Sequence, residues 1–282
     1  MAAASAVPSR ARQRVARREI GGIGPLGLGV AVVWLSLIVL LPLAAIAVES
    51  VGNGIGGFID AIDAPAARAA LLVTLGVSAI VTVVNAIMGT LIAWVLVRDQ
   101  FPGKGFVNAL IDLPFALPTI VASIVLLSLY GPQSPFDIHL NATRPALVVA
   151  LLFVTLPFVV RAVQPVLIEL DREVEEAASS LGAGNLTIFR RVILPSLVPA
   201  ILTGAGLAFT RAIGEYGSVV LIGGGIPRET EVASQYIQKQ IEIDRFVNAA
   251  AVSVALLVIA FVTLLGLRVV ANRASRREQA AS

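Results

Sequence analysis

Six long stretches of this 282-residue chain contain no charged side chain. An α-helix rises about 1.5 Å per residue and the hydrocarbon core of a bilayer is about 30 Å thick, so about twenty apolar residues make one crossing. The fourth stretch is short, but it continues through Arg161, whose long side chain can snorkel to the interface. We therefore predict six transmembrane helices, over residues 27–48, 69–97, 113–135, 145–168, 192–210 and 246–267.

The composition supports a membrane protein rather than a soluble domain. Hydrophobic residues make up 57% of the chain, charged residues only 14%, and the mean hydropathy is +0.90. In a soluble domain about a quarter of the residues are charged. The sequence lacks the ten-residue segments of alternating hydrophobicity that mark membrane β-strands. The predicted fold class is all-α, a polytopic membrane protein.

Basic residues predict the orientation of the chain. Six spans put both termini on one side of the membrane, and cytoplasmic segments next to spans are rich in Lys and Arg. The terminal segments carry Arg10, Arg12, Arg14, Arg17, Arg18, Arg268, Arg273, Arg276 and Arg277. We therefore expect residues 1–24 and 269–282 to be cytoplasmic tails around a transmembrane domain of residues 25–268. The high pI then reflects topology and contact with membrane lipid, and no nucleic-acid partner is expected.

Side chains suited to catalysis or metal binding are scarce. The chain has no cysteine and a single histidine, His139, in a predicted outer loop. One imidazole cannot form a metal site alone. The only Gly-Lys pair, Gly103-Lys104, lacks the upstream glycine and the following Ser or Thr of a phosphate-binding loop. We predict no metal, no cofactor and no enzymatic activity, so that ATP hydrolysis would require a separate subunit.

A charged loop at residues 169–191 separates the fourth and fifth spans. Asp171 can cap a short helix with an acidic first turn, which suits the positive end of the helix dipole. Gly182 and Gly184 can adopt the positive φ of a sharp reversal, and Asn185 can cap a second short helix. The pattern predicts a helical hairpin outside the bilayer. An ordinary amphipathic interfacial loop is the alternative.

The spacing within and after this loop resembles the coupling motif of bacterial ATP-binding-cassette importer permeases. That motif is Glu-Ala-Ala, three residues, Gly, nine residues, an aliphatic residue, one more residue and Leu-Pro. Val192 stands where Ile is usual, and the remaining matches are Glu176, Ala177, Ala178, Gly182, Leu194 and Pro195. Longer blocks at residues 161–167, 189–191 and 208–220 look like the sulfate/thiosulfate permease of the T type.

The resemblance implies a type I (MetI-like) ABC importer permease fold. In that family the short helix of the loop sits in a cleft on a cytosolic ATPase and transmits its motion to the membrane helices. It therefore implies an ATPase-coupling role for Glu175, Glu176, Ala177, Ala178, Gly182, Leu194 and Pro195. It also implies a bacterial inner-membrane location, a second homologous permease subunit, two copies of the ATPase and an extracytoplasmic sulfate-binding protein. The implied function is ATP-driven import of sulfate or thiosulfate into the cytoplasm by alternating access.

Charged and hydroxyl side chains interrupt the apolar sequence after the fifth predicted span. Arg211 and Glu215 are four positions apart and so share one face of a helix. One hypothesis is that Arg211 offsets the charge of a tetrahedral dianion while Tyr216 and Ser218 donate hydrogen bonds. The other is an ion pair that only braces the helix against a neighbour.

The glycine-rich stretch at residues 223–227 is predicted to break the fifth helix, and residues 228–245 to form an amphipathic helix on the outer face. That helix would meet the binding protein or seal the outer end of the domain.

Other functions stay open at this point. A molybdate or tungstate ABC permease has the same architecture. A gradient-driven secondary anion transporter would need an internal inverted repeat, which is not visible in the sequence. A membrane scaffold that transports nothing would keep the hairpin but tolerate replacement of Arg211 and Glu215.

Overall fold

The computed structural model describes residues 24–281, in which helices are the only regular elements. The chain divides into two compact units, residues 1–45 and 46–282. In the first, α1 (Gly24–Leu35) and a π-helical segment, η1 (Ser36–Leu40), lead without a break into α2 (Leu41–Ser50), which continues into the second unit. The predicted tail of residues 1–24 lies, apart from Gly24, outside the described residues.

The second unit holds the remaining helices. They are α3 (Gly54–Asp63), α4 (Pro65–Arg98), α5 (Lys104–Ala116), α6 (Thr119–Tyr130), α7 (Arg144–Glu169), α8 (Arg172–Ser180), α9 (Asn185–Ile188), the π-helical η2 (Phe189–Ile193), α10 (Leu194–Ile213), α11 (Gly217–Val220), α12 (Ala233–Glu242) and α13 (Phe246–Ala281).

Five of the six predicted spans correspond to single helical segments long and apolar enough to cross a membrane. These are Leu26–Ser50, Pro65–Arg98, Arg144–Glu169, Asn185–Ile213 and Phe246–Arg273. The chain is a multi-pass membrane protein.

Two of the predicted spans differ from the structure. The third predicted span, residues 113–135, is wrong as a single helix, because α5 and α6 meet at a bend of 114°. Pro118 cannot donate a backbone hydrogen bond, and residue 117 before it takes an extended conformation. The fifth helix ends at Ile213, ten residues before the predicted glycine-rich break. Helix α13 continues to Ala281, through the segment assigned to a C-terminal tail.

Small residues bring the central helices α4, α7 and α10 together. A Cβ atom on Gly89 of α4 would lie 2.8 Å from Val159 Cβ of α7. A Cβ atom on Gly204 of α10 would lie 2.8 Å from Val159 Cα and 2.9 Å from Ala162 Cβ. Helices in a membrane associate chiefly through such close packing, because lipid tails are as apolar as leucine side chains. The three helices therefore cross at one level, near Val159.

The Gly204 contact gives a direct test of this packing. In Gly204→Ala the new methyl group meets the backbone of α7, which cannot rotate away, so the helices must separate. We expect a loss of about 2 kcal/mol and a fall in melting temperature of roughly 6 °C in the purified complex. The matched control is Gly266→Ala on α13, where a Cβ atom meets nothing within 4 Å. Equal melting of the two variants would contradict close packing at Gly204.

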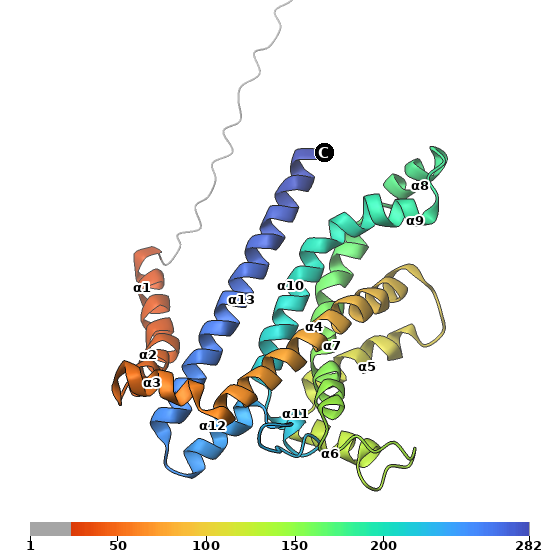
Figure 1. The fold of residues 1–282 in the computed structure, drawn as a ribbon. Coiled ribbons are helices and arrows are strands. Elements are labelled where there is room, and N and C mark those ends of the chain that lie inside the picture. Colours follow the sequence, from red (N-terminus) through yellow and green to blue (C-terminus); the bar gives the residue numbers. More distant parts are fainter. Residues whose placement is uncertain (1–23, 282) are drawn as a thin grey trace, which may run out of the picture. The chain divides into compact units, whose positions relative to one another are not determined.

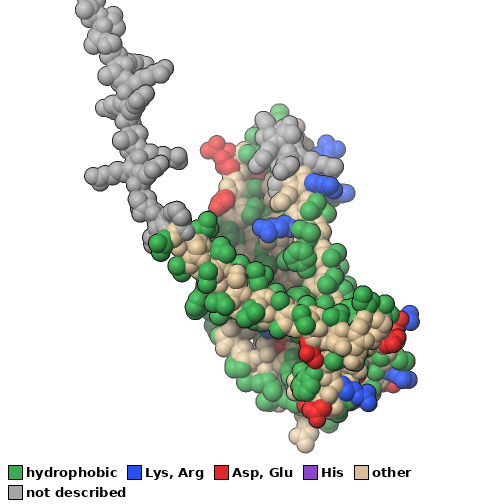
Figure 2. Space-filling model, turned by 90° about the vertical axis from the view of Figure 1, so that its left-hand side faces the viewer, with side chains coloured by type: hydrophobic (Ala, Val, Ile, Leu, Met, Phe, Trp, Pro, Cys, Tyr) green, Lys and Arg blue, Asp and Glu red, His purple; other side chains and the backbone are tan. Residues whose placement is uncertain are grey.

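The second unit has two distinct ends (Figure 1). The hairpin of α8 and α9 and the C-terminal end of α13 lie at one end, and α6, α11 and α12 lie at the other. On the face shown in Figure 2, hydrophobic side chains cover long stretches of the surface and the charged side chains stand in a few groups. This distribution suits a protein much of whose surface faces lipid.

Candidate functional site

The predicted hairpin is present between α7 and α10. Asp171 caps α8, since its Oδ1 accepts a hydrogen bond of 2.9 Å from the backbone N–H of Glu173. Gly182 has a φ of +85°, and the N–H groups of Gly182 and Ala183 donate to the carbonyls of Ser179 and Ala178. This pair of bonds is a Schellman motif, which ends a helix with a sharp reversal.

The second half of the hairpin differs from the prediction by one residue. Gly184 takes an extended conformation with a φ of −72°, so only Gly182 supplies the positive φ. Gly184 is also the residue before α9, and Asn185, the predicted cap, is the first residue of that helix. Leu194 and Pro195 form the first turn of α10 as it enters the apolar region, as predicted.

One side of α8 is attached to the transmembrane helices. Glu175 forms an ion pair with Arg98 in the last turn of α4, and both side chains are mostly buried. The Arg98 guanidinium lies 5.5 Å from the ring centre of Trp94, which packs edge-on against Phe189 at 5.6 Å. A cation over a tryptophan ring and a carboxylate both favour this arginine position. The hairpin is therefore held to α4 through Glu175, and η2, which follows the hairpin, is held to α4 through Phe189.

Other residues of the motif face outward, whereas Ala178 packs against the core. Glu176 and Ala177 are exposed. Leu181 at the reversal is 89% exposed and Leu186 of α9 is 69% exposed. An apolar tip beside an acidic side chain, projecting from the end of the domain, is a surface suited to contact with another protein. The sequence grouped Glu175 with Glu176, but the structure gives the two carboxylates different surroundings.

The second predicted group lies where α10 ends. Arg211 is in the last turn of α10, and Glu215 follows the helix end, yet the two side chains form the expected ion pair. Glu215 is 2% exposed, and its Oε1 accepts a 2.8 Å hydrogen bond from the backbone N–H of Ser218. Tyr216 is 39% exposed. Ser218 is fully buried, and its hydroxyl has no hydrogen-bond partner among residues 24–281.

Two helix breaks meet beside this group. Helix α11 packs on α6, and a Cβ atom on Gly217 would overlap Thr119 and lie 3.0 Å from the backbone nitrogen of Ile120. The bend at residues 117–118 therefore adjoins the break at residues 214–216. Interrupted helices deep in a membrane protein are common at ion and substrate sites, because they free backbone groups inside the bilayer.

The structure contains a third polar group, which the sequence analysis did not identify. Arg161 of α7 does not snorkel but binds Asp112 of α5 through two hydrogen bonds, of 2.7 and 2.5 Å. Asn108 and Gln164 complete the group. A lone arginine and a lone aspartate inside apolar segments are the signal that pointed to it.

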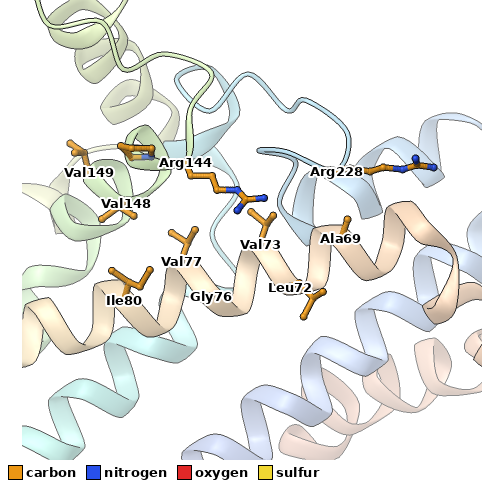
Figure 3. Close-up of a pocket in the computed structure, with 11 residues that line it drawn as sticks. Ala69, Leu72, Val73, Gly76, Val77, Ile80, Arg144, Val148, Val149 and Arg228 are labelled. Carbon is orange, nitrogen blue, oxygen red and sulfur yellow. The ribbon is translucent and has the colours of Figure 1, made fainter.

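An apolar groove of about 760 Å³ runs along α4 near its N-terminal end, with Arg144 and Arg228 at its rim (Figure 3). Residues 69–80 of α4 line it on one side and α7 on the other. The Arg144 Nε donates a 3.0 Å hydrogen bond to the carbonyl of Glu229. The groove holds none of the predicted site residues, and its lining is that of a helix surface facing lipid or another apolar helix.

The predicted amphipathic helix is α12, over residues 233–242 rather than 228–245. Tyr236 faces the core, and Glu231 just before the helix is 3% exposed, with its Oε1 3.7 Å from Lys239 Nζ. Burial raises the pKa of Glu231 above its ordinary value, an effect that Lys239 only partly offsets. Burial and the nearby Glu231 also raise the pKa of Tyr236.

Comparison with known proteins gives a consistent picture. A family model described as "Binding-protein-dependent transport system inner membrane component" matches residues 85–277. The sulfate transport system permease protein CysT of Synechocystis sp. is 45% identical over 243 residues, which cover 84% of this chain and 85% of that protein. The protein of the same name from Escherichia coli is 38% identical over 268 residues, 93% of this chain and 96% of the relative.

Solved structures share the fold at low identity. A chain of a bacterial alginate ABC transporter in complex with a periplasmic protein has a TM-score of 0.73 at 17% identity, covering 89% of this chain and 93% of that one. A chain of the methionine ABC transporter MetNI has a TM-score of 0.56 at 18% identity, covering 73% and 94%. These likenesses concern the fold, which is that of type I ABC importer permeases.

Proposed function

Because this chain belongs to the family of binding-protein-dependent transport system inner membrane components, we propose that it is the permease subunit of an ATP-driven importer of sulfate and thiosulfate. Relatives named as sulfate permeases align over most of its length. The observation that carries the proposal is the hairpin of α8 and α9, which presents Glu176, Ala177 and Leu181 outward while Glu175 is bound to α4.

In this proposal the position of the hairpin determines which end of the second unit is cytoplasmic. If α8 docks on a cytosolic ATPase, the end of the second unit that carries the hairpin and the C-terminus is cytoplasmic (Figure 1). If α5 and α6 are counted as one bent span, the chain crosses the membrane six times. An even number of crossings puts the N-terminus on the cytoplasmic side as well. The opposite end, with α12 and the loop before α7, then faces the extracytoplasmic binding protein.

The assembly proposed from this layout contains several chains. One permease of six spans encloses little space, so a second homologous permease subunit completes the pathway. Two copies of an ABC ATPase bind the two hairpins, and a sulfate-binding protein delivers the substrate from outside. Membrane lipid covers the remaining apolar surface. This chain itself hydrolyses no ATP.

Coupling in this scheme depends on the attachments of α8. Closure of the ATPase pair moves the hairpin, and the Arg98–Glu175 ion pair passes that motion to α4, while α9 leads without a break through η2 into α10. Because these attachments join the hairpin to two spans, the spans move together. Arg211 then contributes a cationic side chain to the oxyanion pathway, and Glu215 limits how tightly an anion can bind it.

Uptake by the assembled complex in vesicles tests the proposal. We expect labelled sulfate to accumulate only with ATP and the binding protein. The Leu181 side chain contacts little of its own chain. We expect Leu181→Asp to release the ATPase during purification and to lower sulfate uptake at least about tenfold. Leu181→Met, which keeps an apolar side chain of similar size at this 89% exposed position, serves as the control and should leave both unchanged.

Other outcomes would replace the proposal. Accumulation that follows an ion gradient without ATP would identify a secondary transporter. Uptake of molybdate in preference to sulfate would identify the related oxyanion permease.

A further inference from the structure

The Arg161 side chain has a complete set of partners inside α5 and α7. Its Nε and one terminal nitrogen donate to the two carboxylate oxygens of Asp112 at 2.7 and 2.5 Å. The other terminal nitrogen donates to Gln164 Oε1 at 2.5 Å and Asn108 Oδ1 at 3.3 Å. Gln164 Nε2 in turn donates to Asn108 Oδ1 at 3.2 Å. We call these four side chains the Arg161 cluster.

The cluster lies within the membrane-spanning part of the chain. Arg161 is two residues beyond Val159, near the level where α4, α7 and α10 cross. It precedes the end of α7 at Glu169 by about 12 Å along the helix axis. Asp112 lies a similar distance, about 12 Å, from the start of α5. Neither helix end is close enough for these charges to be interfacial.

The pair nevertheless stays partly exposed. The side chains of Arg161 and Asp112 are 34% and 48% exposed. A charged pair at this depth is too costly to face lipid, so its open side must face a water-filled path or another protein. If the ion pair only braced α5 against α7, its side chains would not need an exposed side.

The α5–α6 segment connects the cluster to Arg211 and Glu215. From Asp112 the chain runs about one and a half turns to the bend at residues 117–118. Helix α6 then begins at Thr119, against which Gly217 packs. On α10, Gly204 contacts Ala162, next to Arg161, and Arg211 lies about 10 Å farther along that helix. Arg161 and Arg211 therefore lie at different depths in the membrane, near the bend at residues 117–118 and the break at residues 214–216.

We propose that the Arg161 cluster is a second binding position for the tetrahedral oxyanion, on the hairpin side of Arg211. This inference rests on the proposed import function. A guanidinium binds a tetrahedral dianion through paired N–H donors, as it binds Asp112 here. The anion would take the place of the Asp112 carboxylate, and the amide groups of Asn108 and Gln164 can turn to donate. Because each arginine of the pathway keeps a carboxylate partner, each position binds the anion weakly and releases it.

Cysteine accessibility in the assembled, ATP-driven complex tests this placement, because the native chain contains no cysteine. The probe is a membrane-impermeant methanethiosulfonate carrying a sulfonate group, and labelling of this chain is followed on a gel. We expect Asn108→Cys to react, and added sulfate to slow the reaction at least about threefold. Leu110→Cys, on the exposed apolar face of α5, is the control and should stay unlabelled.

The charge of Asp112 provides a second measurement. In Asp112→Asn, Arg161 has lost its anionic partner, so sulfate should protect Asn108→Cys at concentrations about tenfold lower. A purely structural brace would leave that concentration unchanged.

Two results would overturn the inference while sparing the proposed import function. One is an unreactive Asn108→Cys in a complex that transports sulfate. The other is labelling that sulfate does not slow. Failure of the unmodified complex to transport sulfate with ATP would instead contradict the proposed function itself.

Discussion

Replacing Glu215 with alanine is expected to destabilise the permease more than any other single substitution at the predicted site. The Glu215 carboxylate is buried, pairs with Arg211 and accepts a hydrogen bond from Ser218 N–H at the start of α11. Its removal leaves the Ser218 N–H without its acceptor and the Arg211 guanidinium, whose side chain is 35% exposed, without its counter-charge. Breaking a buried ion pair on one side costs about 3–5 kcal/mol. We expect the melting temperature of the purified complex to fall by roughly 10 °C.

Two further variants separate the causes of this loss. Glu215→Gln keeps an acceptor for Ser218 but not the charge, and should melt between the parent and Glu215→Ala. Glu229→Ala, which removes an exposed carboxylate at the outer end, should melt within about 1 °C of the parent. If Glu215→Ala melted like the parent, the ion pair with Arg211 would contribute nothing to stability.

Replacing Gly182 with valine is expected to abolish most ATP-driven uptake while leaving the membrane helices folded. Gly182 has a φ of +85°, a conformation strongly disfavoured for a β-branched residue. The strain of about 1–2 kcal/mol acts on a short hairpin outside the core, whose reversal must be re-formed for docking. Since about 1.4 kcal/mol corresponds to tenfold, we expect uptake to fall about five- to thirtyfold. Labelled-sulfate uptake and substrate-stimulated ATP hydrolysis measure the effect.

The hairpin supplies its own control two residues away. Gly184 has an ordinary φ of −72°, and a Cβ atom there meets nothing within 4 Å. Gly184→Thr, which adds a branched side chain as large as that of valine, should therefore retain at least about half of the parental uptake, since Thr and Gly are about equally favourable at a helix N-cap. Equal losses in both variants would mean that crowding at the hairpin tip, and not the conformation of Gly182, disturbs coupling.

Local sequence signals predicted much of this fold. The uncharged runs located the spans because lipid tolerates few charges, and Asp171 and Gly182 located the hairpin because capping depends on neighbouring residues. Pro118 predicts a bend within the third run, but the division into two helices at 114° could not be predicted because the apolar run continues through it. The end of α10 at Ile213 was missed because charged residues after a span are compatible with further helix, and Glu215 is held instead by Ser218 N–H.

The long-range contacts of the site could not be predicted in the same way. Arg98 and Glu175 are 77 positions apart, and Asp112 and Arg161 are 49 positions apart. A single sequence indicates that each charge needs a partner but not which one, because the choice depends on how helices pack. The separate surroundings of Glu175 and Glu176 follow from the same packing. Arg211 and Glu215 were paired correctly because they are close in sequence.

The crossing near Val159 makes α10 a lever with unequal arms. Helical structure extends from Asn185 to Ile213, and Gly204 touches α7 between these ends. The arm toward the hairpin measures about 28 Å and the arm toward the outer break about 14 Å. If α10 tilts as a rigid rod about Gly204, a displacement at the hairpin reaches Ile213 reversed in direction and halved in size. A large displacement at the hairpin end of α10 thus becomes a small, opposite displacement beside Arg211.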